Sequence, residues 1–209
     1  RHVLTAHEQG AAHAADGYAR ATGKTGVVFA TSGPGATNLV TGIATAFMDS
    51  IPMVAITSNV ANSLIGRDAF QEVYITGITM PITKHNFFVN KVEDLAHAVR
   101  EAFRIAATGR KGPVLVDVTK DVSAALCEFE PKEAEHQVKM PTASDEEIQK
   151  IADMINQAER PAIYCGGGVP ASDAGHELQA LIHKADIPIA YTMMAVGIVG
   201  YNDTHSLGM

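Results

Sequence analysis

The sequence has little cysteine and no long apolar or basic run, and each absence excludes a class of protein. Its two cysteines, Cys127 and Cys165, lie far apart without CxxC spacing, which favours a reducing compartment, the cytoplasm. No apolar run reaches the roughly 18 residues that a membrane span needs. Sixteen basic side chains stand against 23 acidic ones, for a formal charge of -7. We therefore expect no membrane segment and no nucleic-acid partner.

Several catalytic and metal-binding motifs are also absent. None of the nine histidines takes part in an HxxxH or HExxH pattern, so the spacing predicts no metal site made by the chain alone. Neither the phosphate-binding GxxxxGK[ST] pattern nor the GxSxG pattern of serine hydrolases occurs. The sequence also shows no internal repeat. Function must therefore be inferred from other residues and their neighbours.

An alternation of short apolar runs and helical stretches indicates the fold class. The chain has 209 residues, 46% of them hydrophobic and 19% charged, which is enough to bury a sizeable core. Expected strands lie at 27–31, 53–57, 87–89 and 114–118, and expected helices at 7–22, 36–48 and 92–108. This alternation predicts an α/β fold with a mostly parallel sheet. The strand at 27–31 is expected to be buried on both faces.

A charged, proline-bearing stretch at 127–143 interrupts the alternation and predicts a linker. After it, Ser144 and Glu147 fit the S-x-x-E capping box that opens a helix. A strand, a helix and another strand are expected at 162–165, 172–184 and 187–192. The predicted organisation is a three-layer, mostly parallel-sheet domain at 1–126, a linker at 127–143, and part of a second Rossmann-like α/β domain at 144–209.

The most informative carboxylate is Glu8, which begins a helical stretch of small residues that a flat ligand can approach closely. Thr31 ends an expected strand and is followed by the turn Ser32-Gly33-Pro34-Gly35. Open α/β folds bind ligands at the carboxyl ends of their strands, so we expect a site beside Glu8 and Thr31. Taken alone, an isolated glutamate here more often complements a helix N-terminus, and the turn has an even chance of being purely structural.

Several ordered motifs together resemble one enzyme family. HEQG at 7–10, GYAR at 17–20 and TSGPGATN at 31–38 resemble the pyrimidine-binding domain of thiamine-diphosphate enzymes. SNVANSLIGRDAFQE at 58–72 and ITKH at 82–85 are similar to the next segments of the acetolactate synthase family, in its catalytic subunit. The resemblance runs to about residue 121 and continues more weakly beyond. It implies an N-terminal and middle-domain fragment of such an enzyme.

The resemblance assigns a role to each matching residue. It makes Glu8 the catalytic residue, which hydrogen-bonds the aminopyrimidine of thiamine diphosphate and favours its imino tautomer. Such a carboxyl group is expected in an apolar pocket, where desolvation raises its pKa. Thr31, Pro34 and Asn38 match positions lining the pyrimidine, and Gln71 matches one that reaches the reacting end of the cofactor.

The resemblance also implies contacts with a 2-oxo-acid substrate. Phe70, Gln71 and Lys84 match positions around the substrate entrance. Lys84 is expected to attract the substrate carboxylate by charge, and the alternative is a solvated surface lysine.

The segment after residue 143 resembles the FAD-binding middle domain of the same family, where bare backbone approaches a dinucleotide's pyrophosphate. The implied contacts are Gly166, Gly167, Gly168, Thr192 and Met193. Met80 stands where many relatives carry an arginine that touches FAD, so we expect weak flavin binding. The family holds Mg²⁺ and the diphosphate through a Gly-Asp-Gly segment in a third domain, and no segment here matches it. The chain alone is therefore expected to be inactive.

By resemblance, the parent enzyme is a transferase of branched-chain amino-acid biosynthesis. It decarboxylates pyruvate and joins the two-carbon unit to pyruvate or 2-oxobutyrate, as a homodimer or tetramer with a regulatory subunit as a further partner. Two alternatives stay open. Another thiamine-diphosphate carboligase or 2-oxo-acid decarboxylase would keep Glu8 but select a different acceptor, although the DAFQE segment at 68–72 favours the first activity. A non-catalytic dinucleotide-binding module would not need the Glu8 motif.

Overall fold

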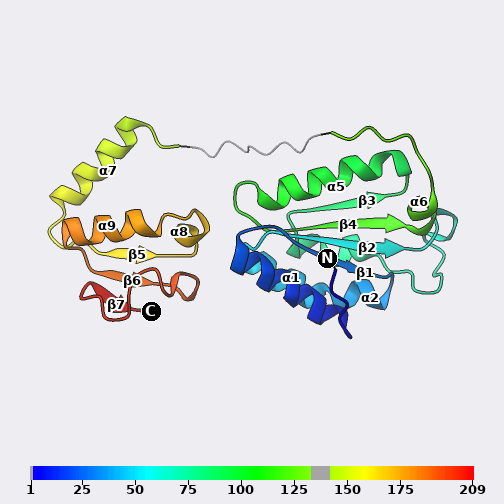
Figure 1. Cartoon of the computed structure of the whole chain (residues 1–209), viewed down its shortest axis with the longest axis horizontal. Helices are drawn as coiled ribbons and strands as arrows, with labels where there is room; N and C mark the ends of the chain where they lie inside the picture. Colours follow the sequence, from blue (N-terminus) through cyan, green and yellow to red (C-terminus); the bar gives the residue numbers. More distant parts are fainter. Residues whose placement is uncertain (1, 133–141) are drawn as a thin grey trace. The chain divides into compact units, whose positions relative to one another are not determined.

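The computed structural model describes residues 2–132 and 142–209. The chain divides into two compact units, residues 1–139 and 140–209 (Figure 1), and each is described by itself. The linker expected at 127–143 falls partly outside the described residues, so the proposed domain boundaries stay predictions. No helix among the described residues has the length and apolar character of a membrane span.

The first unit is built on a four-stranded parallel sheet in the order β1-β2-β4-β3. Its strands are β1 (Gly26–Ala30), β2 (Met53–Asn59), β3 (His85–Val89) and β4 (Pro113–Thr119). Its longer helices are α1 (Glu8–Thr22), α3 (Val40–Met48) and α5 (Val92–Ala107). Its shorter helices are α2 (Pro34–Asn38), η1 (Asn62–Leu64), α4 (Ile75–Thr79), η2 (Met80–Ile82) and α6 (Lys120–Ala124). The expected mostly parallel α/β fold is confirmed.

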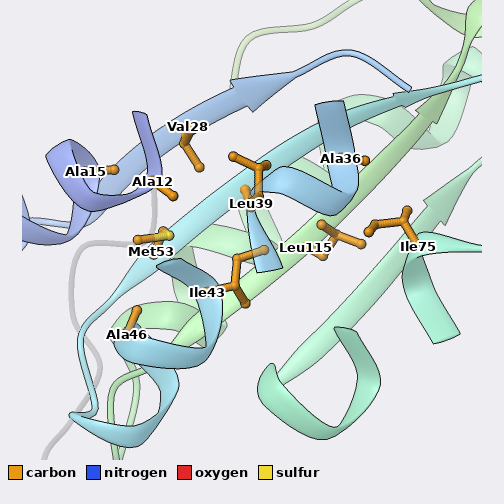
Figure 2. Packing of buried hydrophobic residues seen from close by; sticks show 11 residues of the cluster. Ala12, Ala15, Val28, Ala36, Leu39, Ile43, Ala46, Met53, Ile75 and Leu115 are labelled. Atoms are coloured by element: carbon orange, nitrogen blue, oxygen red, sulfur yellow. The ribbon is translucent and has the colours of Figure 1, made fainter. Parts of the chain in front are cut away.

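Side chains alternate between the two faces of this sheet, and each face has its own apolar core. On one face, Met53 of β2 and Leu115 of β4 pack with residues of α1, α2, α3 and α4 (Figure 2). On the other face, Val54 and Val114 pack with the alanine stripe Ala98, Ala102 and Ala106 of α5. All of these side chains are buried. Helices on both faces thus hold the central strands β2 and β4 in place.

The edge strand β1 differs from the sequence prediction. Val28 is buried on the face covered by α1, but Val27 and Phe29, on the other face, are 40% and 68% exposed. The core on that face is built from α5, α6 and strands β2, β3 and β4, and it includes no residue of β1. The expectation that this strand is buried on both faces is therefore wrong for the described residues.

Small residues let α1 and α3 approach each other closely. A Cβ on Gly42 of α3 would lie 2.3 Å from the Cβ of Ala12 in α1. Helix α1 begins after His7, whose Nδ1 accepts a hydrogen bond from the Gln9 backbone N–H at 3.0 Å. It ends at Gly23, which has a positive φ of 69° and caps the last turn. The small-residue helix and its glycine stop are as predicted.

The expected helix at 36–48 is divided into α2 and α3. Pro34 and Gly35 already belong to α2, and the chain turns at Leu39, whose backbone N–H donates to the carbonyl of Ala36 at 3.1 Å. This three-residue spacing tightens the turn and reorients the chain between the two helices.

The second unit has a smaller sheet of three parallel strands in the order β5-β6-β7. Its elements are α7 (Asp145–Gln157), β5 (Ile163–Cys165), α8 (Gly168–Ala171), α9 (Gly175–Ala185), β6 (Ile189–Tyr191), η3 (Met193–Ala195) and β7 (Ser206–Gly208). Its apolar core includes Cys165, Ile182, Ile189 and Val199. The capping box is confirmed, because the Ser144 and Glu147 side chains each accept the other's backbone N–H.

The helix expected at 172–184 is present as α9, but it begins three residues later than predicted. The short α8 precedes it, and Asp173 lies between the two helices at a positive φ of 57°. A residue in this left-handed conformation cannot continue an α-helix, which explains the break. Asp186, with φ of 52°, ends α9 in the same way.

Candidate active site

Three predicted site residues meet beside the carboxyl end of β1. Glu8 is the first residue of α1, Thr31 directly follows β1, and Asn38 is the last residue of α2. The Asn38 side-chain amide donates to Oε2 of Glu8 at 3.0 Å. The turn from β1 into α2 therefore brings residues 30 positions apart into contact, at the edge where parallel sheets carry their ligands.

Two glycines of the turn allow close packing at this site. A Cβ on Gly35 would lie 2.6 Å from Cγ2 of Thr31 and 3.4 Å from Oε1 of Glu8. A Cβ on Gly33 would lie 2.7 Å from the backbone oxygen of Gln71, and Gly33 also has a positive φ of 61°. Neither position accepts a larger residue without displacement of its neighbours. The backbone of this turn thus packs closely beside the carboxylate of Glu8.

The loop that carries Gln71 is closed on itself by hydrogen bonds to Glu72, and the Gln71 backbone lies close to Gly33. The carboxylate of Glu72 accepts the backbone N–H of Gly66 and, at 2.9 Å, that of Ala69. These backbone hydrogen bonds lower the pKa of Glu72. Asp68 and Gln71 have positive φ angles of 52° and 59°, a conformation that costs non-glycine residues energy and is concentrated at functional sites.

The electrostatics of Glu8 differ from the sequence expectation. Glu8 is half-buried, and the hydrogen bond from Asn38, helped by its backbone hydrogen bond, lowers its pKa. The apolar pocket expected here would instead raise this pKa. The carboxylate stays partly accessible to water, so desolvation is the weaker effect.

Pro34 and Phe70 lie around this cluster with exposed side chains. Pro34 opens α2 and is exposed at the rim of the turn. Phe70 precedes Gln71 and is 89% exposed. A large apolar side chain this accessible can contact another molecule, but the described residues give it no pocket of its own.

The structure does not bring Lys84 to this cluster. Lys84 directly precedes β3, and its backbone N–H donates to the carbonyl of Pro113 at the start of β4. It therefore lies at the amino end of the parallel strands, whereas Thr31 lies at their carboxyl end. Its ammonium donates to the carbonyls of Ile105 and Thr108 at the end of α5, and burial lowers its pKa. This arrangement supports a helix-capping role and not the expected contact with a substrate.

A buried carboxylate that the sequence analysis did not identify supports the same edge of the sheet. Asp117 of β4 is 1% exposed and accepts hydrogen bonds from Thr57 at 2.7 Å and Asn59 at 2.6 Å. Burial raises its pKa, and the two hydrogen bonds oppose this shift. Asn59 in turn accepts the backbone N–H of Val60, where the chain leaves β2. A charged residue within the apolar run 114–118 was the available signal.

In the second unit, the glycine segment lies against residues 192–194. The backbone N–H of Thr192 donates to the carbonyl of Cys165 at 2.9 Å. A Cβ on Gly167 would lie 2.9 Å from the Cβ of Met194. Gly168 and Met193 are exposed, while Gly166 and Thr192 are half-buried. The structure thus brings the expected cofactor contacts together at the carboxyl ends of β5 and β6.

Two models of known enzyme families match parts of this chain. A model described as "Thiamine pyrophosphate enzyme, N-terminal TPP binding domain" matches residues 1–78. A second, described as "Thiamine pyrophosphate enzyme, central domain", matches residues 148–209. The two matches cover most of the chain in the expected order. The chain therefore belongs to the thiamine pyrophosphate enzyme family.

Within that family, similar curated proteins are acetolactate synthases. The chain is 51% identical over 217 residues to the acetolactate synthase large subunit of Corynebacterium glutamicum. It is 50% identical over 212 residues to the acetolactate synthase of Mycobacterium leprae, and 48% over 214 residues to a probable large subunit from Methanocaldococcus jannaschii. All of this chain is covered in each case, but only 34%, 34% and 36% of the respective relatives. The chain thus spans about a third of their length, and the resemblance found in its motifs is confirmed.

Proposed function

We propose that this chain supplies the pyrimidine-binding half of the active site of an acetolactate synthase. The main observation that supports this proposal is the Glu8–Asn38 hydrogen bond, which lies beside the glycine backbone of the turn. The parent enzyme would decarboxylate pyruvate and transfer the two-carbon unit to pyruvate or 2-oxobutyrate, in the cytoplasm. The relatives' names support this assignment.

The described residues fit the aminopyrimidine of thiamine diphosphate. The backbone at Gly35 lies close to the carboxylate, since a Cβ there would lie 3.4 Å from Oε1 of Glu8. When bound, thiamine diphosphate supplies carbanion chemistry at its thiazolium ring. Asn38 orients the carboxylate of Glu8 through Oε2, and Oε1 of Glu8 holds the proton shared with the ring. A ligand covering Glu8 would raise its pKa by desolvation and favour this sharing.

Thr31, Pro34 and Gln71 complete the proposed pyrimidine site. Thr31 and the backbone at Gly35 limit how deeply a flat ring can enter the proposed site. Gln71 lies on the adjoining loop. Phe70 is the proposed substrate contact, because it is exposed next to Gln71.

FAD and Mg²⁺ are the further proposed cofactors of the parent enzyme. Gly166, Gly167 and Gly168 with Thr192 and Met193 form the proposed flavin contact, supported by their common place at one end of the second sheet. Met80 is 63% exposed and offers no guanidinium donors, so we expect weak flavin binding. No Gly-Asp-Gly segment occurs in the chain, so the Mg²⁺-diphosphate contacts are assigned to another part of the parent enzyme.

The proposal is tested by the products of the purified parent enzyme with pyruvate, thiamine diphosphate and Mg²⁺. Acetolactate is the expected product. Release of acetaldehyde without acetolactate would instead support a decarboxylase, and absence of both products would support a non-catalytic module. Adding 2-oxobutyrate measures the acceptor preference, and gel filtration of the same preparation tests the proposed homodimer or tetramer.

The 209-residue chain by itself serves as the negative control for this experiment. We expect it to form no acetolactate with both cofactors in excess, because the diphosphate contacts that position the cofactor are missing, and positioning is a large part of rate enhancement. Sustained turnover by a preparation free of the parent enzyme would contradict this.

A further inference from the structure

Two histidines and an aspartate converge in the second unit, outside the glycine segment. His183 lies in the last turn of α9, and Asp203 and His205 lie in the segment just before β7. Nε2 of His183 lies 2.9 Å from Oδ2 of Asp203, and Nδ1 of His205 lies 3.0 Å from Oδ1 of Asp203. One ligand atom from each of the three residues lies within 4.8 Å of the others.

The local backbone fixes this arrangement. The backbone N–H of His205 donates to Oδ1 of Asp203 at 2.9 Å, which holds the two side chains on one short turn. The rings of His183 and His205 meet edge to face with centroids 5.1 Å apart. Asp203 and His205 have side chains only 15% and 17% exposed, whereas that of His183 is 53% exposed. The cluster is thus largely preformed and open to solvent on one side.

The charge distribution calls for a cation at the centre of the cluster. Nε2 of His205 lies 3.0 Å from Oδ1 of Asp186, so both ring nitrogens of His205 face carboxylates. Either a proton or a metal ion on Nδ1 of His205 satisfies this geometry.

We propose that His183, Asp203 and His205 form a binding site for a divalent transition-metal ion of the Zn²⁺ class. Two imidazoles and one carboxylate are a ligand set for Zn²⁺, whereas Mg²⁺ and Ca²⁺ prefer oxygen ligands. Small side-chain movements bring the three ligand atoms to the roughly 2.0–2.2 Å that zinc requires. The exposed side of His183 leaves a fourth position for water.

Asp186 provides the outer partner that such sites usually have. Metal-bound histidines commonly donate their other ring N–H to a carboxylate, which fixes the ring orientation and strengthens the ligand. Asp186 stands in this relation to His205, although its own side chain is 95% exposed. Metal binding would tie the end of α9, through His183, to the segment that leads into β7.

Sequence spacing alone does not reveal this site. His183 and His205 are 22 positions apart, and the positive φ of Asp186 and the strand β6 lie between them. The cluster shares no residue with the proposed pyrimidine or flavin sites. Its test is therefore independent of the proposed function.

The test is Zn²⁺ binding by the 209-residue chain in buffer free of Mg²⁺ and thiamine diphosphate, measured by equilibrium dialysis with metal analysis. His183→Ala and His205→Ala are the test variants, and His176→Ala is the matched control, since His176 is an exposed histidine on the same helix. We expect both test variants to lose one bound Zn²⁺ per chain, or to bind it at least about tenfold more weakly, while the control matches the wild type.

Asp186→Asn is a second variant, chosen because its highly exposed side chain makes misfolding an unimportant concern. It should weaken Zn²⁺ binding by about tenfold through loss of the outer carboxylate. Circular dichroism verifies that each variant is folded. Equal zinc stoichiometry and affinity in the wild type, His183→Ala and His205→Ala would overturn the proposal.

Discussion

The two units share a parallel-sheet design but differ in how much core supports it. The first unit has strands of five to seven residues with an apolar cluster on each face. The second has three strands of three residues each and one cluster, and its helix α7 has no buried residue. Site residues of the first unit therefore stand on well-supported elements. The glycine segment of the second unit lies on shorter strands with a single apolar cluster.

Deletion of a core side chain from each unit should make this difference visible. Leu115→Ala and Ile182→Ala both empty fully buried positions, and each should cost about 3 kcal/mol of unfolding free energy. We expect the first unit to stay folded and the second to lose most of its stability. Amide hydrogen exchange of β4 reports on the first unit, and labelling of the buried Cys165 thiol reports on the second. Equal losses of folded population would show that the two cores are equivalent.

The buried Asp117 should be the next most sensitive position. Asp117→Ala leaves Thr57 and Asn59 without their acceptor and should cost about 2–3 kcal/mol, whereas Asp117→Asn should cost less than about 1 kcal/mol because Thr57 can accept instead. Urea unfolding measures both values. Similar losses in the two variants would mean that burial volume, and not hydrogen bonding, determines the effect.

The same residue predicts a pH dependence. Because burial raises the pKa of Asp117 above its usual 3.8, the folded chain binds this proton more tightly than the unfolded chain. Its contribution to stability is therefore greatest at low pH and falls as pH rises from about 3.8 through the raised pKa. The unfolding free energy of Asp117→Asn should lack this fall. An unchanged pH profile in that variant would contradict the assignment.

A smaller effect is expected where α1 and α3 approach each other. Gly42→Ala places a Cβ 2.3 Å from that of Ala12 and should destabilise the first unit by about 2 kcal/mol through overpacking. Gly17→Ala is the control, because a Cβ at this helical position meets no atom within 4 Å and should stabilise α1 by up to about 1 kcal/mol. Thermal unfolding compares the two. A neutral Gly42→Ala would show that the helices separate readily.

Among the described residues, local patterns predicted the longer helices and every strand except β7, but not how these elements are covered. Apolar runs located the central strands. The glycine that ends α1 and the capping box at Ser144 were predictable because each depends only on residues close in the sequence. The exposure of Phe29 depends on whether another element covers β1, which periodicity does not report. The late start of the helix expected at 172–184 depends on the backbone angle of Asp173, since aspartate occurs in both conformations.

The candidate site could be predicted in part for the same reason. Glu8, Thr31 and Asn38 lie in recognisable motifs, and the turn after β1 brings them together. The hydrogen bonds of Lys84 to the end of α5 and those of Asp117 to β2 are long-range contacts that motif matching does not include. The lowered pKa of Glu8 likewise reflects a side-chain amide placed by the fold.

The most direct test of the central claim is the turnover of Glu8→Gln in the parent enzyme. Turnover should fall by at least about tenfold, because the substituted amide cannot share a proton with the cofactor ring. Folding should be unchanged, since Glu8 is only half-buried and Asn38 can still donate to an amide oxygen. The rate of proton exchange at the thiazolium of bound thiamine diphosphate should fall with turnover, while cofactor affinity changes little. Near-normal turnover in a folded, cofactor-saturated variant would contradict the account.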